Sequence, residues 1–203
     1  MQENVGVSER PRGRPPETSH DAIRDVAITL FLEQGFAKTS LASIASAAVI
    51  SRTTLFSYFP SKRDLIWEDH DRRDEDVEQT LAQGPARPAV DLMVRAMLAH
   101  SSYRIGEHAL LASRVRIAEE DDELRAYSAL AQQRVTERIS QGIAERVPEA
   151  DPGLIALVTR ALVGAASRCT EEWAALERPS EGLDAYTARR IAPITHALRP
   201  LLP

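Results

Sequence analysis

The apolar residues of this chain recur with the spacing of helices rather than of strands. In the first periodic stretch they are Ile23, Val26, Ala27, Leu30 and Phe31. Steps of three and four residues predict an amphipathic helix with one buried face. Ser19 is a favourable N-cap for this helix, and Gly35 can end it because glycine accepts a left-handed backbone.

Two short helices are predicted next, the first over 40–47 and the second from Ser51 to the residue before Pro60. The inward-facing residues are expected to be Leu41, Ile44 and Ala45 in the first helix and Leu55, Phe56 and Phe59 in the second. The tight break "AAVI" separates them. Two short helices joined by a turn of about three or four residues form a helix-turn-helix.

The rest of the chain also has helical spacing. Residues 64–83 predict one long connecting helix, because Gly and Pro are absent until Gly84. Further helices are expected at roughly 88–103, 105–118, 122–147, 152–177 and 183–198, separated by prolines and glycines. The predicted fold class is therefore all-α, with three parts: a flexible basic arm over 1–18, a three-helix helix-turn-helix domain over 19–66, and a C-terminal helical domain over 67–203.

Charge is distributed unevenly over these parts. The whole chain of 203 residues has a formal charge of −5. Residues 1–63 hold eight Lys/Arg and six Asp/Glu, and the remainder holds seventeen and twenty-four. Between Gln34 and Arg63 there is no Asp or Glu, whereas Lys38, Arg52 and Lys62 are basic. This segment therefore suits a polyanionic partner, although a chance gap in the acids of a helical surface is the alternative.

The arm is a second basic segment. Its sequence "RPRGRPP" places Arg10, Arg12 and Arg14 within five residues. Such an arm can reach the backbone or minor groove of DNA, and a solvated tail is an equally good interpretation.

Several classes of protein find no support in the sequence. The N-terminus lacks the apolar core of a signal peptide, and no apolar run approaches the length of about eighteen residues that crosses a bilayer. Cys169 is the single cysteine, so an intramolecular disulfide is impossible. We therefore expect a cytoplasmic protein without membrane contact. Because no phosphate-binding loop, nucleophile elbow or closely spaced histidine pair occurs, we predict no catalytic residues, no metal site and no cofactor.

The segment "TSLASIASAAVISRTTLFSYFPSKRDL" resembles the DNA-binding signature of TetR-family regulators. This resemblance implies that residues 52–54 begin a recognition helix in double-stranded DNA and that Tyr58 and Lys62 contact phosphates. The predicted DNA-binding residues are Arg14, Thr39, Ser51, Arg52, Thr53, Thr54, Ser57, Tyr58 and Lys62. For Tyr58 the alternative is a half-buried ring packed on the first helix. Ala48 stands where the family has glycine in the turn, and a positive φ there would be costly for alanine.

The same resemblance implies a homodimer that binds a palindromic operator, usually as a repressor. The stretch "LIALVTRALVGAASRC" is rich in small residues, which let helices approach closely. The predicted interface residues are Leu157, Ala161, Gly164, Ala165, Ile191 and Ile194. A core helix of a monomer is the alternative for this stretch.

A ligand pocket is expected among the middle helices. Bulky and adaptable residues of the kind that line apolar pockets are Met93, Met97, Tyr103, Leu111, Arg114, Tyr127 and Trp173. An ordinary helical core would need the same residue types. The segment "YFPSKRDLIWEDHD" also resembles an actinobacterial subgroup linked to acyl-CoA-like ligands and mycofactocin-type loci. That resemblance implies a small effector of apolar or acyl type, such as an acyl-CoA-like molecule. We expect binding of the effector to release DNA through the connecting helix.

Two other classes of function remain open. One is a helical binding or scaffold protein that uses its basic patch for an acidic protein partner. The other is a small helical enzyme that builds its site from residues dispersed in the sequence.

Overall fold

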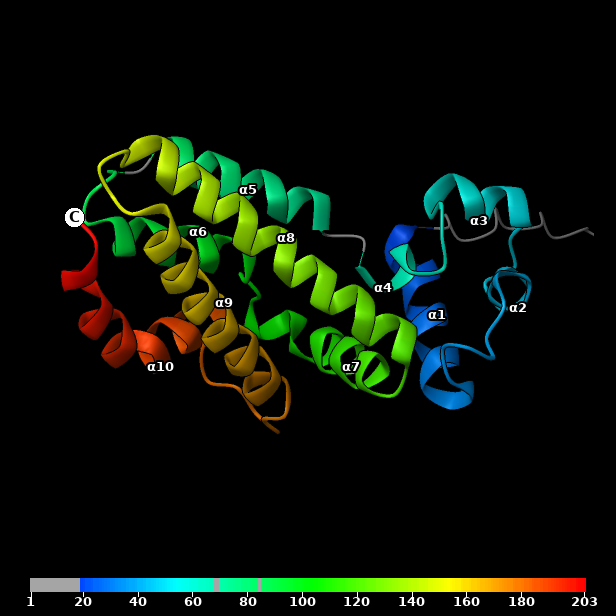
Figure 1. Cartoon of the computed structure of the whole chain (residues 1–203). Helices are drawn as coiled ribbons and strands as arrows, with labels where there is room; N and C mark the ends of the chain where they lie inside the picture. The colour runs from blue at the N-terminus through cyan, green and yellow to red at the C-terminus, as the bar shows by residue number, and fades with distance from the viewer. Residues whose placement is uncertain (1–18, 68–69, 84) are drawn as a thin grey trace, which may run out of the picture.

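The computed structural model describes residues 19–67, 70–83 and 85–203 of the chain. All regular elements in these ranges are helices, which confirms the all-α fold class. The predicted basic arm, with Arg14, lies outside the described residues. The N-terminal helices lie at one end of an elongated molecule, and the C-terminal helices form the larger body (Figure 1).

The N-terminal helices are α1 (His20–Gln34), α2 (Leu41–Ala47), α3 (Arg52–Tyr58) and α4 (Asp64–Trp67). Their starts follow the local sequence. The hydroxyl oxygens of Ser19, Ser40 and Ser51 accept backbone N–H groups at the starts of α1, α2 and α3. At its other end α1 is followed by Gly35 with φ 86°. Apolar residues from all four helices, among them Ile23, Ile44 and Leu65, form one core cluster.

The turn between α2 and α3 corrects the expectation for Ala48. Ala48 has φ −77° and ψ −2°, an ordinary helical conformation, so it is not strained. The left-handed residue is Val49, with φ 56°. The Ile50 N–H donates to the Ala45 carbonyl and the Val49 N–H to the Ser46 carbonyl. These two bonds form a Schellman motif, in which the residue with positive φ directly follows the C-cap.

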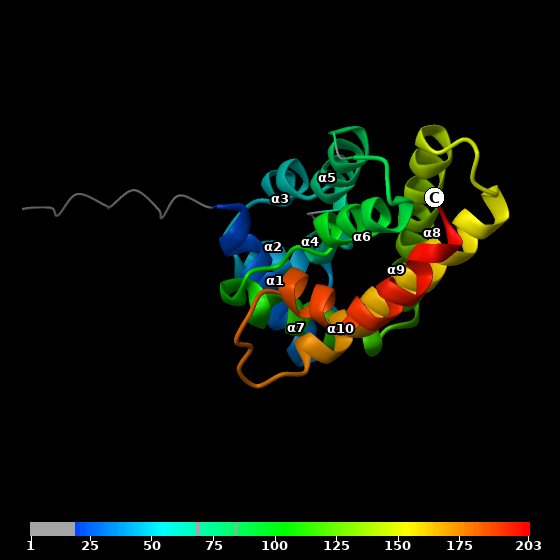
Figure 2. The same ribbon diagram turned by 90° about the vertical axis from the view of Figure 1, so that its left-hand side faces the viewer.

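The C-terminal body contains eight helical segments. They are α5 (His70–Gln83), α6 (Ala89–His100), η1 (Ile105–Glu107), α7 (His108–Glu119), α8 (Asp122–Arg146), α9 (Pro152–Ala174), α10 (Leu183–Leu198) and η2 (Arg199–Leu201). Apolar side chains of α5, α6, α8, α9 and α10 form a second core cluster. Figure 2 shows α10 running along α9. By length and composition α9 would also pass as a membrane-crossing helix, although Arg160 interrupts its apolar run.

The expectation of one connecting helix over 64–83 stays a prediction, because α4 ends at Trp67, α5 begins at His70 and the residues between them lie outside the described ranges. Leu65 and Ile66 bury α4 in the N-terminal core, whereas Val77 and Leu81 bury α5 in the C-terminal core. Between these two pairs the sequence offers no buried aliphatic residue among the described positions.

Candidate functional site

Helix α3, the predicted recognition helix, has one buried and one exposed side. Leu55 and Phe59 are fully buried, as predicted. Arg52, Thr53 and Ser57 are exposed. Phe56, which the sequence assigned to the core, is 43% exposed. At 100° per residue, Phe56 lies about 40° from Arg52 around the helix axis, on the exposed side. Apolar character alone could not show on which side of the boundary this residue falls.

The hydroxyl groups of α3 mainly bond to the helix itself. Ser51 Oγ accepts the Thr54 N–H at 2.9 Å and lies 2.8 Å from Thr54 Oγ1. Ser57 Oγ donates to the Thr54 carbonyl at 2.7 Å. Ser51 and Thr54 therefore cap the helix, and Arg52 and Thr53 are the predicted residues whose side chains remain available to a partner.

Thr39 and Lys62 hold the loop between α1 and α2. Thr39 is 1% exposed, and its hydroxyl donates to the Gly35 carbonyl at 2.9 Å. Lys62 Nζ donates to the carbonyls of Phe36 and Thr39 at 2.8 and 3.2 Å. It also lies 4.0 Å from the centroid of the Phe36 ring. Both side chains thus have a structural task, and Lys62 keeps its charge near the surface.

Tyr58 is half-buried, and its ring packs edge-on against the ring of His20 with centroids 4.7 Å apart. His20 is the first residue of α1. This geometry agrees with the alternative of a ring packed on the first helix, and the phosphate contact of Tyr58 stays a prediction.

A cavity of about 450 Å³ lies in the C-terminal body. Helices α8 and α9 diverge from their connection, and α7 lies near their open end (Figure 1). The cavity is lined by the N-terminal half of α8 and the C-terminal half of α9, together with residues of α4 to α7. Pockets of this volume accommodate small organic molecules.

Three of the seven predicted pocket residues line this cavity, namely Met97, Tyr103 and Leu111. Met93, Arg114 and Trp173 are instead fully buried in the surrounding core. Arg114 Nη1 donates to the Tyr103 hydroxyl at 3.4 Å, and Trp173 Nε1 donates to the Glu181 carbonyl at 3.0 Å. These residues therefore support the cavity from behind.

Tyr127 belongs to the junction with the helix-turn-helix rather than to the cavity. The guanidinium carbon of Arg63 lies 5.1 Å from the centroid of its ring. Arg63 Nε is also 3.9 Å from a carboxylate oxygen of Glu123. Tyr127 and Glu123 both lie in the first turns of α8, next in sequence to the cavity residues Arg125 and Ser128.

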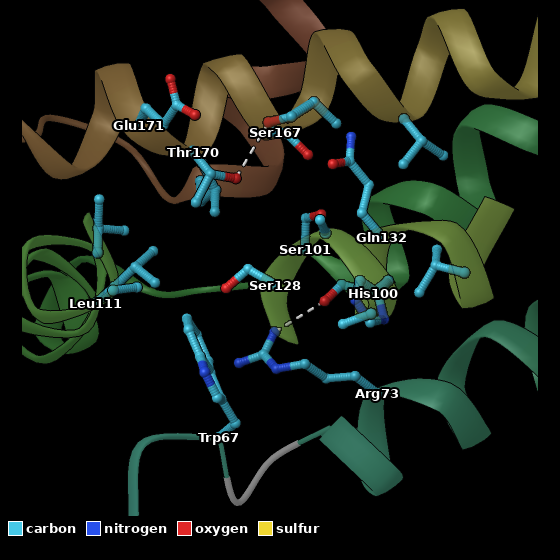
Figure 3. A pocket seen from close by; sticks show the side chains of 18 of the residues that line it. Trp67, Arg73, His100, Ser101, Leu111, Ser128, Gln132, Ser167, Thr170 and Glu171 are labelled. Atoms are coloured by element: carbon cyan, nitrogen blue, oxygen red, sulfur yellow. Dashed lines mark hydrogen bonds between the residues drawn. The ribbon is translucent and has the colours of Figure 1, made fainter. Parts of the chain in front are cut away.

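The cavity wall is more polar than the sequence predicted. Hydroxyl and amide side chains along it are Ser101, Ser128, Gln132, Ser167 and Thr170 (Figure 3). Apolar lining comes from the predicted residues and from others such as Val135 and Val163. These polar residues could not be predicted from the sequence, because isolated Ser and Gln residues on a helix carry no pattern.

Arg73 and His100 form the charged corner of the cavity. Arg73 is 4% exposed, donates through Nη1 to the carbonyls of His100 and Ser102 at 3.0 and 3.1 Å, and has its guanidinium carbon 3.8 Å from the Tyr103 ring centroid. Burial, aided by the charges of Arg73 and Arg138, lowers the pKa of His100 from 6.5 to about 4. His100 is therefore neutral at pH 7 and leaves Arg73 as the cation of this corner.

Trp67 and the α7–α8 corner link the cavity to the N-terminal core. Trp67 is the last residue of α4, lines the cavity and packs on the N-terminal core cluster. Ala118 lines the cavity as well and, with Ile117 and Leu124, belongs to that same cluster. A ligand in the cavity would thus touch residues that also support the helix-turn-helix.

The exposed face of α9 carries small and apolar residues together with Arg160 and Arg168. Leu157 is 67% exposed, and Ala161 and Gly164 are exposed beside it. Ala165 is half-buried, and Ile194 of α10 is 44% exposed. Ile191 differs from the other predicted interface residues, because at 2% exposure it is part of the C-terminal core.

The chain matches two family models. Residues 23–68 match the model of bacterial regulatory proteins of the tetR family, and residues 87–199 match the model of the MftR C-terminal domain. The putative mycofactocin biosynthesis transcriptional regulator MftR of Mycobacterium tuberculosis is 33% identical over 135 residues, which are 66% of this chain and 68% of that protein. The regulator AcrR of Shigella flexneri is 47% identical over 49 residues, 23% of each chain.

Solved structures of regulators share the fold. NalD of Pseudomonas aeruginosa, described as the secondary repressor of the MexAB-OprM multidrug efflux pump, has a TM-score of 0.56 at 23% identity and covers 90% of this chain and 94% of its own. A transcriptional regulator from Aquifex aeolicus has a TM-score of 0.56 at 15% identity, with 88% and 98% covered. The two family models and the mycobacterial relative establish that the chain belongs to the TetR family of DNA-binding transcriptional regulators and carries an MftR-type C-terminal domain.

Proposed function

We propose that the protein is a repressor that binds a palindromic operator as a homodimer and is released by a small effector in the C-terminal cavity. The observation that carries the proposal is the exposed face of α3, where Arg52 and Thr53 project from a segment without any acidic residue between Gln34 and Arg63. Basic and neutral polar side chains on one helix face suit phosphates and base edges. An acidic partner protein is the weaker candidate, because the family is one of DNA-binding regulators.

The dimer follows from the exposed stripe of α9. Helix α9 already buries its other side in the subunit core through residues such as Val158 and Leu162. On the remaining side the exposed Leu157 would cost free energy in water, and the small residues Ala161 and Gly164 allow a partner helix to approach closely. Two recognition helices would then read half-sites about one helical turn apart. Leu157, Ala161, Gly164 and Ile194 form this proposed interface, whereas the buried Ile191 supports it from inside.

The effector is proposed to be amphipathic and of acyl type. An acyl chain would lie against Met97, Leu111 and Val135, while its polar end would bond with Ser128 and Gln132. A purely apolar ligand would leave these polar groups without partners, which is unfavourable. By similarity to the mycobacterial regulator, the operator is proposed to lie beside genes of mycofactocin biosynthesis.

Titration of operator DNA by fluorescence anisotropy tests this function. The DNA is the segment upstream of the protein's own gene. We expect binding by the dimer that weakens as salt increases, and a tenfold or greater loss of affinity in Arg52→Ala if a bidentate base contact is removed. Lys38→Ala, which removes an exposed charge outside α3, is the matched control. It should weaken the binding of all DNA sequences to the same extent.

The effector requires a separate measurement. Palmitoyl-CoA should release the DNA, and CoA alone should not. Release by neither compound, or equal release by both, would contradict the acyl-type effector while leaving the operator function intact.

A further inference from the structure

The exposed face of α3 contains an aromatic residue that the resemblance did not assign to DNA contact. Phe56 is 43% exposed although α3 has a buried side available for apolar residues. Leu55 and Phe59 occupy that side, and Phe56 is absent from the N-terminal core cluster. A single exposed apolar residue is common on protein surfaces. The position of Phe56 relative to Arg52 and Thr53 is what suggests a role in binding.

Helical geometry places Phe56 in the middle of the exposed face. Measured from Arg52 at 100° per residue, Phe56 lies at about 40°, Thr53 at about 100° and Ser57 at about 140°. The half-buried Thr54 and Tyr58 lie at about 200° and 240°, toward the other side. Phe56 lies between Arg52 and Thr53 around the helix axis and one turn further along it, so a surface that follows this face of α3 would also meet its ring.

The chemistry of phenylalanine restricts what it can contact there. A phenyl ring has no hydroxyl group, so Phe56 cannot donate a hydrogen bond to a phosphate. Among the base edges in the major groove, the C5-methyl group of thymine is the apolar feature. Arginine on the same face is suited to guanine, whose O6 and N7 accept a bidentate pair. Four residues of helix rise about 6 Å, which is roughly two base-pair steps.

We propose that Phe56 is a specificity-determining residue that selects a thymine through its methyl group, within about two base pairs of a guanine read by Arg52. The inference rests on the proposed operator function and adds a base preference to it. Each half-site would then contain one thymine whose methyl group is buried against the Phe56 ring. Replacement of thymine by uracil removes that methyl group and changes no hydrogen bond.

The experiment uses the full chain and an operator sequence selected from random double-stranded DNA. Each thymine of the half-site is replaced by uracil, symmetrically in both half-sites, and affinity is measured by anisotropy. At one thymine position we expect a loss of about fourfold per half-site, the equivalent of one buried methyl group, and therefore roughly fifteenfold for the symmetric change. In Phe56→Ala the thymine and uracil operators should bind equally, whereas Phe56→Leu should keep part of the preference.

Controls separate this effect from loss of folding or of DNA binding altogether. Leu130→Ala removes an apolar residue that is 53% exposed on α8 and should retain the full uracil effect. Binding that shows no uracil-sensitive position, or a uracil effect of equal size in Phe56→Ala, would overturn the role of Phe56 while the operator function stands. Absence of binding to any selected sequence would overturn the operator function and this inference with it.

Discussion

Val49 has the one left-handed backbone conformation among the described non-glycine residues. Its side chain is β-branched and 90% exposed, so no packing inside the subunit compensates for the conformation. For an L-residue this conformation costs about 1–2 kcal/mol, and glycine adopts it without that cost. The turn of the helix-turn-helix therefore contains removable strain at Val49, not at Ala48.

Val49→Gly should raise the free energy of unfolding by about 1 kcal/mol, because relief of strain exceeds the added flexibility of the unfolded chain. Urea unfolding followed by circular dichroism measures this. Ala48→Gly is the matched control: its φ of −77° is ordinary, so glycine there should destabilise by about 0.5–1 kcal/mol. Equal effects of the two substitutions would contradict the assignment of the strain.

His100 is the residue whose ionisation couples most clearly to folding. Burial is the largest cause of its lowered pKa, and Arg73 and Arg138 act in the same direction. Asp74 also faces the ring, with a carboxylate oxygen 3.9 Å from Nδ1, but does not outweigh burial and the two cations. The folded protein therefore resists protonation of this imidazole between pH 6.5 and about 4.

Within that pH range the unfolded chain binds more protons than the folded protein. Stability should therefore fall as pH drops from 6.5 to about 4, with a contribution from His100 of about 2–3 kcal/mol. In His100→Gln this contribution disappears, so the variant should lose less stability than the wild type when urea unfolding is compared at pH 7 and pH 4.5. The exposed His196→Gln should behave as the wild type does. A pH dependence unchanged in His100→Gln would refute the coupling.

At the scale of helices, α9 combines two faces with different tasks. Its buried face completes the C-terminal core, and its exposed stripe has space for a partner helix at Gly164. A Cβ atom built on Gly164 meets nothing within 4 Å in the single chain. On Gly142 of α8 the same atom would lie 2.8 Å from Leu81 Cδ1. A side chain at position 142 would therefore have to displace the end of the Leu81 side chain, whereas one at position 164 would displace nothing in the single chain.

Gly164→Leu should give a helical protein that sediments as a monomer, because the leucine fits the free subunit and obstructs close approach of a second α9. Sedimentation velocity together with circular dichroism measures both properties. Gly142→Leu should instead destabilise the subunit itself by overpacking against Leu81, by about 1–3 kcal/mol. A Gly164→Leu protein that remains dimeric would show that the interface lies elsewhere.

The helices and the helix-turn-helix could be predicted from the sequence because periodicity and caps are local properties. The phase of a seven-residue helix could not: Leu55, Phe56 and Phe59 are all apolar, and tertiary packing places Leu55 and Phe59 in the N-terminal core cluster and leaves Phe56 outside it. The burial of α4 and α5 in two separate cores also depended on tertiary packing rather than on a local signal. For the cavity, Met97 and Leu111 were found as bulky residues, whereas Ser128 and Ser167 face it because α8 and α9 diverge. That divergence is a non-local property.

At the scale of the whole molecule, Trp67 is a natural reporter of the cavity. The chain has two tryptophans, and Trp173 is fully buried outside the cavity lining. We expect palmitoyl-CoA to change the intrinsic fluorescence and Trp67→Phe to remove the change, leaving the emission of Trp173. The DNA affinity of Trp67→Phe without ligand serves as the control for folding. A fluorescence change of undiminished size in Trp67→Phe would place the ligand elsewhere.

The α7–α8 corner has a consequence for building chimeric biosensors. Such proteins join the N-terminal helix-turn-helix of one regulator to the C-terminal body of another, and the junction is placed where the two parts meet in the sequence. Here Ile117, Ala118 and Leu124 complete the N-terminal core cluster, although in the sequence they belong to the C-terminal body. In a chimera joined only near Trp67, the α7–α8 corner of the other regulator would pack against the N-terminal core of this one. Transplanting residues 117–124 together with the N-terminal helices should preserve the N-terminal core. These residues also include part of the cavity wall, so the N-terminal helices and the cavity cannot be exchanged independently.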